Sequence, residues 1–326
     1  MKDGTSVRIG IIGTGSIARD QHGPACVEVA GAQLNSVLSR TAENADNFAS
    51  SFVLDRKVKS FIDRDAFLAD DSLDAVIIAS PDSLHFEQAK ACLEAGKHVL
   101  VEKPFALTLD ESLALIQLAD KTGLQLGVGF HLRWHPGIEH VLNLIKKREI
   151  GNVRHIAMRW TFLRDTTADW RADPAFSRWW SLSGVGSHCL DLMRMFMDRF
   201  GWTRSFLSGS CMSGILGSRN EETTLITAIF QQGLTAQILS SVLFPSQSEL
   251  SFFGDKGSIT CDGLLGRSAP GIVTLNGMPS TYVFENPYRR QLEGFCSSII
   301  KGSPFPVHGK VWIDVLNDLN HISREE

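Results

Sequence analysis

The chain has 326 residues, of which 43% are hydrophobic and 21% charged, as is typical of a globular protein that buries a core. Its 32 basic and 36 acidic residues give a formal charge of −4, and no basic run exceeds Lys146-Lys147-Arg148. This balance excludes the electrostatic footprint of a nucleic-acid-binding protein or of one that binds an acidic membrane surface.

Membrane, export and metal-binding signals are also missing from the sequence. No apolar stretch approaches the ~20 residues of a membrane span. The apolar run near the N-terminus breaks at Gly13, too early for a signal peptide. The cysteines form no C-x-x-C pair and no metal-ligand spacing. We therefore expect a cytoplasmic protein without a metal site.

The first 130 residues alternate apolar strands with helical patterns. In chain order the sequence predicts a strand at Val7–Ile12, a helix at 16–30, a strand at Gln33–Leu38, a helix at Ala42–Ser51, a strand at Asp74–Ala79, a helix at 83–95, a strand at His98–Val101, a helix at Leu109–Lys121 and a strand at Leu124–Val128. Such repetition indicates parallel β-α-β units. We therefore predict an α/β Rossmann domain with a doubly wound parallel sheet over residues 1–130.

The character of the sequence changes after residue 130, where all seven tryptophans lie. We predict helices at 136–148 and 187–199, and strands at 152–162, 204–213, 222–231, 234–243, 248–254, 257–261 and 272–275. Turn residues such as Gln231-Gln232-Gly233 separate neighbouring strands as they do in hairpins. We therefore predict an α+β domain with a mostly antiparallel sheet over residues 131–326.

A glycine pattern follows the first predicted strand. Its first glycine allows a tight turn, its second lets the backbone approach a pyrophosphate, and its final alanine permits close contact between helix and strand. The helix N-terminus then presents free N–H groups to the phosphates. The alternative is a tight turn that binds nothing, but the position in an alternating series favours a dinucleotide site. The pattern G-x-G-x-x-A consists of Gly13, Thr14, Gly15, Ser16, Ile17 and Ala18.

The end of the second predicted strand distinguishes between cofactors. An acidic residue there would bind the ribose 2′-hydroxyl of NAD, but this chain has Ser39 and Arg40 instead. A hydroxyl and a guanidinium suit the 2′-phosphate of NADP. NADP(H) is therefore favoured. NAD(H) use stays open if Arg40 only covers the adenine face.

Lys103 ends a predicted strand, in the segment Glu102-Lys103-Pro104. Ligands of open α/β sheets bind at the carboxyl ends of the strands, so this lysine is expected near the nicotinamide. It could exchange a proton with a reacting hydroxyl or carbonyl, with Glu102 orienting it. The alternative is an ordinary surface lysine, which this position disfavours.

Taken together, these motifs resemble the family of glucose-fructose oxidoreductase, inositol dehydrogenase and the rhizopine-catabolism oxidoreductases. The resemblance rests on 13–18, on Ser80-Pro81 with His85, on the run from Gly96 to Pro104, on Arg133 with Pro136, on Gly186-Ser187-His188 with Asp191, and on Asn286-Pro287-Tyr288. It implies a Rossmann domain followed by an α+β domain with a large open sheet that is often used for oligomerisation. The implied substrates are sugars, sugar derivatives or cyclitols.

The resemblance also implies roles for individual residues. Lys103 matches the family's catalytic lysine, and His188 matches the histidine that faces the substrate and could accept or return a proton. Ser80, Pro81, His85, Glu102 and Lys103 are implied in cofactor binding. One departure is Gly184, where many members carry an aspartate four residues before the histidine. Whether Asp191 compensates for it is left open.

Further candidates for contact with the substrate are Arg133, Trp170, Arg171, Asp191 and Tyr288. Arg133 could hold an anionic or polyhydroxy substrate, with a structural ion pair as the alternative. Trp170-Arg171 and Trp179-Trp180 could form an aromatic wall for a sugar ring, with a place in the core or in a subunit interface as the alternative. Tyr288 could be a hydroxyl at the pocket edge or a buried anchor.

The sequence thus predicts an NADP(H)-dependent oxidoreductase that acts on a small polyhydroxy substrate and forms a homo-oligomer, either a dimer or a tetramer. One alternative is a catalytically weak dinucleotide-binding sensor or regulator, which the missing aspartate slightly supports. Another is a reductase of a non-sugar carbonyl or imine, for which a carboxylate partner is less necessary.

Overall fold

The computed structural model describes residues 6–164 and 169–323. Within these ranges the chain forms two compact units. The first contains the described chain up to Gly129 together with Tyr288–Ile313, and the second contains Phe130–Pro287 and the chain from Asp314 onward. None of the helices in the described ranges is long and apolar enough to cross a membrane.

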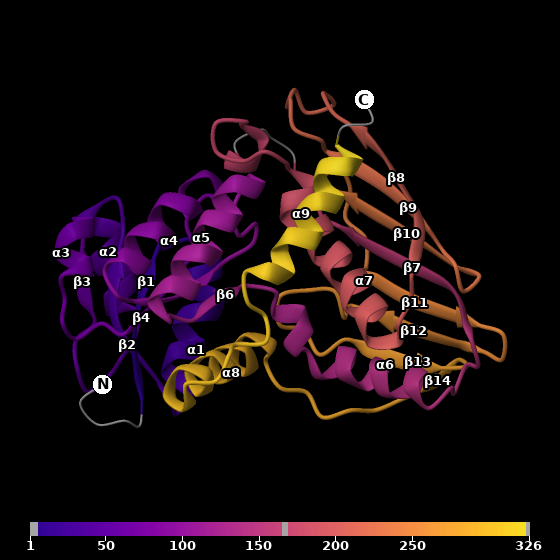
Figure 1. Cartoon of the computed structure of the whole chain (residues 1–326), viewed down its shortest axis with the longest axis horizontal. Helices are drawn as coiled ribbons and strands as arrows, with labels where there is room; N and C mark the ends of the chain where they lie inside the picture. The colour runs from indigo at the N-terminus through magenta and orange to yellow at the C-terminus, as the bar shows by residue number, and fades with distance from the viewer. Residues whose placement is uncertain (1–5, 165–168, 324–326) are drawn as a thin grey trace. The chain divides into compact units, whose positions relative to one another are not determined.

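A six-stranded parallel sheet forms the centre of the first unit (Figure 1). The strands occur in the order β3-β2-β1-β4-β5-β6, and each pairs in parallel with its neighbours. All four residues of β4 are fully buried, as expected for an apolar strand of a parallel sheet. The predicted doubly wound sheet is confirmed. Its elements are β1 (Val7–Ile12), α1 (Gly23–Glu28), β2 (Ala32–Leu38), α2 (Ala42–Ser50), β3 (Lys59–Phe61), α3 (Arg64–Leu68), β4 (Ala75–Ile78), α4 (His85–Glu94), β5 (His98–Val101), α5 (Leu109–Thr122) and β6 (Leu126–Val128).

The strand order reverses at β1, which lies between β2 and β4. In open α/β sheets, such a switch point opens a crevice at the carboxyl ends of the strands. The loop that begins at Gly13 follows β1 directly, and Lys103 lies two residues after the end of β5. The topology therefore brings both predicted motifs to the same edge of the sheet.

The sequence predicts one helix over 16–30, but the structure has a π-helical segment followed by a short α-helix. A π-helical segment, Ala18–His22, precedes α1, and the Gly23 N–H donates to the Ala18 carbonyl. Pro24 accounts for the wider turn, because it has no N–H and its ring crowds the carbonyl four residues earlier. The π-helical segment carries His22 into the interior, where the side chain is 2% exposed.

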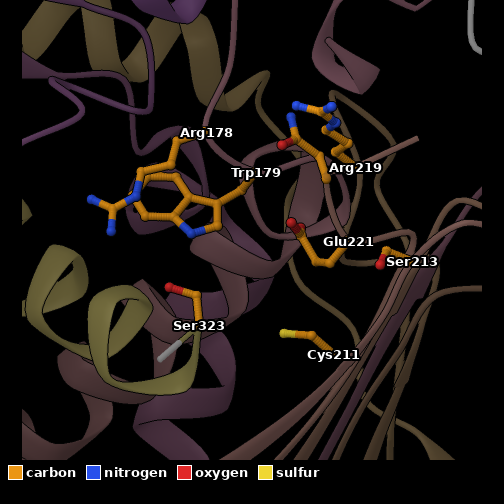
Figure 2. Close-up of a pocket in the computed structure, with 8 residues that line it drawn as sticks. Arg178, Trp179, Cys211, Ser213, Arg219, Glu221 and Ser323 are labelled. Atoms are coloured by element: carbon orange, nitrogen blue, oxygen red, sulfur yellow. The ribbon is translucent and has the colours of Figure 1, made fainter. Parts of the chain in front are cut away.

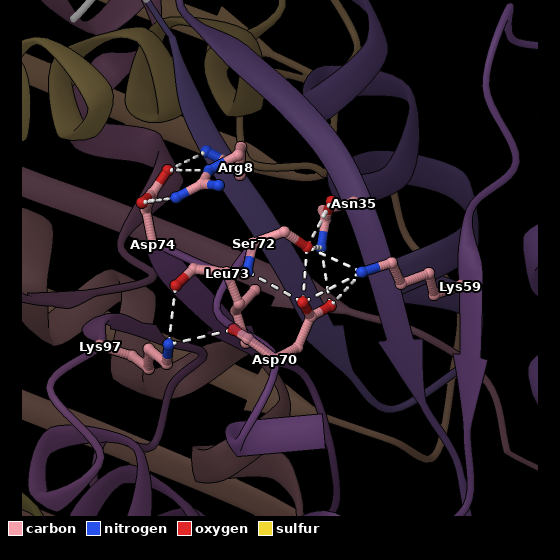
Figure 3. A network of polar contacts seen from close by, with 8 residues as sticks. All are labelled: Arg8, Asn35, Lys59, Asp70, Ser72, Leu73, Asp74 and Lys97. Atoms are coloured by element: carbon pink, nitrogen blue, oxygen red, sulfur yellow. Dashed lines mark hydrogen bonds and ion pairs between the residues drawn. The ribbon is translucent and has the colours of Figure 1, made fainter. Parts of the chain in front are cut away.

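Polar side chains tie together the opposite edge of this sheet, where the strands begin (Figure 3). Arg8 donates to both carboxylate oxygens of Asp74, at 2.8 and 2.6 Å. Asp70 accepts from Lys59 at 2.8 and 3.0 Å and from the Ser72 hydroxyl at 2.6 Å. Although burial opposes the shift, these hydrogen bonds lower the pKa of Asp70 to about 2. These contacts stabilise the end of the sheet that lies opposite the glycine loop.

An eight-stranded sheet forms the second unit, in the order β14-β13-β12-β11-β7-β10-β9-β8. Only β7 and β10 pair in parallel, and the other neighbours are antiparallel. The predicted large, mostly antiparallel sheet is confirmed. Its elements are α6 (Pro136–Lys146), β7 (Val153–Thr161), α7 (Ser187–Phe200), β8 (Arg204–Met212), β9 (Thr223–Phe230), β10 (Leu234–Ser241), β11 (Glu249–Gly254), β12 (Ser258–Asp262), β13 (Ile272–Leu275) and β14 (Met278–Pro279).

The two faces of this sheet differ. Helices α6 and α7 lie along one face (Figure 1), where Phe196 of α7 packs edge-on against Phe252 at 4.9 Å. The residues of β9 alternate between buried and exposed. Its exposed residues include Leu225 and Ile229, which point to solvent on the other face of the sheet. The alternation arises because successive side chains of a strand point to opposite faces.

The last part of the chain contains two helices that the sequence analysis did not predict, α8 (Pro287–Lys301) and α9 (Lys310–Ile322). Residues 288–313 belong to the first unit, so the structure departs from the predicted linear division at residue 130. Gln291 donates to the Val128 carbonyl at 3.2 Å, and the Trp312 indole donates to the Ala106 carbonyl at 3.0 Å. Burial of their apolar side chains against the first unit determines where these residues pack.

Candidate active site

The glycine loop after β1 has the backbone that a dinucleotide turn requires. Gly13 has φ +102°, and a Cβ atom there would lie 2.5 Å from the Ala79 carbonyl oxygen. A Cβ atom at Gly15 would meet nothing within 4 Å, so this side of the loop is open. Ala18 is fully buried, which permits close packing of the helix on the strand. These residues fit a pyrophosphate bound at the helix N-terminus.

The loop after β2 holds the residues expected to discriminate between cofactors. Ser39 is 9% exposed, and its hydroxyl lies 3.1 Å from the Thr14 hydroxyl. Arg40 is exposed and makes no ion pair with any residue in the described ranges. Thr41 caps α2 by accepting from the Asn44 N–H. A hydroxyl and an uncompensated guanidinium thus stand beside the glycine loop.

His85 joins two loops at the carboxyl edge of the sheet. Its Nδ1 lies 2.6 Å from the Pro104 carbonyl oxygen, and its Nε2 lies 3.0 Å from the Ser80 carbonyl oxygen. Both partners are backbone carbonyl oxygens, which accept hydrogen bonds. The side chain is 1% exposed. His85 therefore ties the Ser80-Pro81 turn to the loop that contains Lys103.

Lys103 is 8% exposed and precedes Pro104 through a cis peptide bond. The neighbouring Glu102 carboxylate is held on both oxygens: Oε1 lies 2.7 Å from His22 Nε2, and Oε2 accepts from the Lys103 backbone N–H at 3.2 Å. The Tyr288 ring packs edge-on against His22 at 5.3 Å. Glu102 thus contacts the backbone of Lys103, and Tyr288, which is 3% exposed, packs against the histidine that binds Glu102.

In the second unit, aromatic rings surround His188 on the first turn of α7. Trp160 stacks on the imidazole at 5.5 Å with an interplanar angle of 28°. His131 and Phe130 approach it edge-on at 4.8 and 6.0 Å. His131 is itself fastened to the Gly266 carbonyl at 2.8 Å. The imidazole ring is therefore held in one orientation by its neighbours.

Arg133 and Asp191, both predicted to bind substrate, bind each other. The Arg133 Nε lies 2.9 and 3.0 Å from the two carboxylate oxygens, and Nη2 lies 2.8 Å from one of them. Burial raises the pKa of Asp191 to about 6, although the Arg133 guanidinium acts in the opposite direction. The sequence left Arg133 open as a substrate ligand or as part of a structural ion pair, and the structure contains the ion pair.

An aromatic ring occupies the space beside Gly184, one helical turn before His188. A Cβ atom at Gly184 would lie 3.3 Å from Cζ and 3.4 Å from Cε1 of Phe162. Phe162 follows β7 two residues after Trp160, so the two rings lie on the same side of that strand. Arg164 Cζ lies 5.0 Å from the centre of the Phe162 ring. The first atom of an aspartate side chain at residue 184 would therefore be in tight contact with this aromatic ring, which would have to shift by a few tenths of an ångström.

The other predicted aromatic residues have different environments. The Arg171 guanidinium lies 4.0 Å over the Trp170 ring, and both residues are half-buried. Trp179 and Trp180 are 1% and 0% exposed and belong to the interior. Among the described residues no group of three or more His, Cys, Asp or Glu side chains is arranged to hold a metal ion.

Sequence reasoning missed His22, Trp160 and Phe162. Only His22 had a usable signal, because it lies four residues after Ala18 on the helix that opens at the glycine loop. Trp160 and Phe162 lay in a predicted strand, but nothing in that strand indicated that they would face residues 188 and 184.

A Rossmann unit with a pyrophosphate-type turn, joined to a unit built on a large open sheet, defines a class of two-domain nicotinamide-dependent oxidoreductases. The chain belongs to the GFO/IDH/MocA family within this class. Residues 7–130 match the family described as "Oxidoreductase family, NAD-binding Rossmann fold", and residues 138–260 match the "GFO/IDH/MocA C-terminal domain". The predicted family and enzyme class are confirmed.

Individual relatives agree with this assignment. The chain is 27% identical to D-xylose 1-dehydrogenase (NADP(+)) 2 of Haloferax volcanii, over 96% of this chain and 95% of the relative. It is 30% identical to scyllo-inositol 2-dehydrogenase (NADP(+)) IolU of Bacillus subtilis, over 78% of this chain and 76% of the relative. The fold matches the crystal structure of aldose-aldose oxidoreductase from Caulobacter crescentus with a TM-score of 0.87, at 22% identity and over 98% of this chain and 97% of the other.

Proposed function

We propose that the protein transfers a hydride between NADP(H) and a carbon that bears a hydroxyl or carbonyl group in a sugar, sugar derivative or cyclitol. The observation that carries this proposal is the joint position of the glycine loop after β1 and Lys103 after β5 at the carboxyl edge of one sheet. Relatives that are named as D-xylose and scyllo-inositol dehydrogenases support the substrate class.

The cofactor would be held by the loops described above. Gly13, Gly15 and the helix N-terminus would receive the pyrophosphate, and Ser39 with Arg40 would receive the 2′-phosphate. Two relatives carry NADP(+) in their names, which supports NADP over NAD. When bound, the nicotinamide ring supplies the hydride acceptor or donor.

Lys103 and His188 would handle the proton. During oxidation one of these side chains would accept the proton of the substrate hydroxyl. During reduction the same group returns a proton to the new alkoxide. Glu102 would keep the Lys103 backbone in place through the contacts at 3.2 Å to the N–H and 2.7 Å to His22.

A pair of lysines at the two ends of β5 provides the test. We expect Lys103→Met to lower turnover by about 10²- to 10⁴-fold while NADPH still binds. Lys97→Met is the matched control, because its Nζ donates to the Leu73 carbonyl at 2.9 Å at the other end of the strand. Turnover is followed by absorbance of NADPH with a panel of aldoses, sugar phosphates and cyclitols. Unchanged turnover in Lys103→Met would remove this lysine from the mechanism.

The same panel separates the alternatives. The second candidate is a reductase of a non-sugar carbonyl or imine. Residue 184 is a glycine beside the apolar ring of Phe162, so this position offers no carboxylate to bind a substrate hydroxyl. Turnover of simple ketones or imines without turnover of sugars would support this candidate. Tight NADPH binding without any turnover would support a sensor.

We also propose that the open face of the eight-stranded sheet joins copies of the chain into a dimer or tetramer. Phe206 and Ile229 are direct cross-strand neighbours on this face and are 49% and 47% exposed, and Phe253 is 41% exposed. We expect Ile229→Asp to reduce the mass measured by light scattering after gel filtration. Ile62→Asp, at an exposed site of the first unit, is the control, and equal masses for all three proteins would refute the interface.

A further inference from the structure

Two adjacent glutamates precede β9, and both are buried. Glu221 is 7% exposed and Glu222 is 0% exposed. Each accepts hydrogen bonds from backbone N–H groups of a different segment. Glu222 accepts from Ile215 and Leu216 at 2.8 and 2.7 Å, and so holds the connection between β8 and β9.

Glu221 instead binds the start of the helical run that leads into α7. Its Oε1 accepts from the N–H groups of Trp180 at 3.0 Å and Leu182 at 2.7 Å. Its backbone carbonyl accepts from the Ser181 N–H at 3.0 Å. The first N–H groups of a helix have no partner within the helix, and a carboxylate satisfies them and interacts favourably with the helix dipole. Glu221 therefore caps this run from a distant part of the sequence.

The capped run carries the predicted reacting group. A π-helical segment, Leu182–Gly186, continues directly into α7, and His188 lies on the first turn of α7. In the described structure, neither Ser181 nor Gly186, the residues that precede the two segments, makes a side-chain cap hydrogen bond. The start of the run is thus held by Glu221 rather than by a cap of its own.

We propose that Glu221 is a positioning residue for His188, holding the start of its helix so that the imidazole keeps its place against Trp160. This inference rests on the proposed role of His188. Glu221 lies 33 positions from His188 in sequence and acts only through the helix.

A pocket of about 200 Å³ opens onto Glu221, which lines it together with Trp179, Arg178, Cys211, Arg219 and Ser323 (Figure 2). The charged and titratable groups of this lining are the two guanidiniums, the thiol and Glu221 itself. Burial raises the pKa of Glu221 to about 7, although the N–H groups of Leu182 and Trp180 lower it. The charge of the cap therefore changes near neutral pH, and an ionised carboxylate accepts stronger hydrogen bonds than a protonated one.

A series at residue 221 separates reach from charge. Glu221→Gln keeps an oxygen at the same distance, whereas Glu221→Asp keeps the charge but is one methylene shorter. We expect Glu221→Ala and Glu221→Asp to lower kcat by about 10- to 100-fold, as for a misplacement of about 1 Å, with the Kd for NADPH unchanged. Glu221→Gln should retain most of kcat and lack the component of the pH profile that titrates near neutrality.

Glu222→Ala is the matched control, because it removes the neighbouring buried carboxylate, which binds the β8–β9 connection instead. It should lower the unfolding temperature and leave kcat of the folded enzyme unchanged. The His188 imidazole resonance in the NMR spectrum, assigned with His188→Gln, gives a readout that needs no turnover. It should move in Glu221→Asp and not in Glu222→Ala.

The outcomes are distinct. A kcat and a His188 resonance that are unchanged in Glu221→Asp would overturn the inference, as would equal losses in the residue 221 and residue 222 variants. If Glu221→Ala does not fold, the comparison of Gln with Asp decides. Absence of turnover in the unmodified protein would refute the proposed function, while the resonance shift would still report whether Glu221 positions the imidazole.

Discussion

Replacement of Arg133 by methionine would leave the Asp191 carboxylate, whose side chain is 1% exposed, buried without its cation. Three contacts of 2.8 to 3.0 Å would be lost. Removing one partner of a buried pair typically costs about 3–5 kcal/mol, because the remaining charge has no compensation. We therefore expect Arg133→Met to lower the free energy of unfolding by about this amount.

Denaturant unfolding measures this loss, and two further variants sharpen it. In the double variant Arg133→Met with Asp191→Leu, both charges are removed, and stability should recover because apolar residues of similar size often replace a buried pair without loss. Arg194→Met is the matched control: Asp318 keeps Arg204, whose guanidinium nitrogens lie 2.8 and 2.6 Å from its oxygens, so the loss should be smaller.

Kinetics separate the two readings of Arg133. A structural pair predicts an unstable Arg133→Met variant whose folded fraction keeps the wild-type KM for substrate. A stability loss below about 1 kcal/mol together with a large rise in KM would refute the ion-pair reasoning and make Arg133 a substrate ligand.

Three further predictions follow from the geometry. Gly184→Asp alone should lower stability and turnover, because its Cβ would lie 3.3 Å from Phe162. Adding Phe162→Ala should restore kcat/KM toward polyhydroxy substrates. Full activity of the single variant would contradict this reasoning. Arg40→Asp should lower kcat/KM for NADPH by about 10- to 100-fold and spare NADH, the loss expected when a charged hydrogen bond to the 2′-phosphate is removed. Wild-type stability should fall as pH drops from about 4 toward 2, where Asp70 with its lowered pKa takes up a proton, and Asp70→Asn should flatten this part of a pH series of unfolding curves.

Two buried histidines at the carboxyl edge of the first unit bind other protein groups. The proposed reaction does not require either of them to contact the substrate. His85 joins the Ser80 and Pro104 carbonyls, and His22 holds the Glu102 carboxylate. Both fasten the short segment that presents Lys103. A rigid backbone at this point matters because proton transfer depends on a donor that is held in place before the reaction.

Local patterns in the sequence were sufficient for the main strands of the first unit. Runs of Val and Ile predict strands buried on both faces, and the structure has them at β1, β4 and β5. The need for glycine at residue 13 is equally local, because φ +102° is strained for any side chain. The short elements β3 and α3 were missed, since three to five residues carry too little periodicity to detect.

Tertiary structure alone decided which side chains meet. Arg133 finds Asp191 across 58 residues, His22 finds Glu102 across 80, and Glu221 caps a helix that begins 39 positions earlier. Hydrophobic periodicity records which face of an element is buried, but it contains no information on which distant element covers that face. The same reason explains α8: its apolar side chains predict burial, and only the folded chain determines that they pack with the first unit.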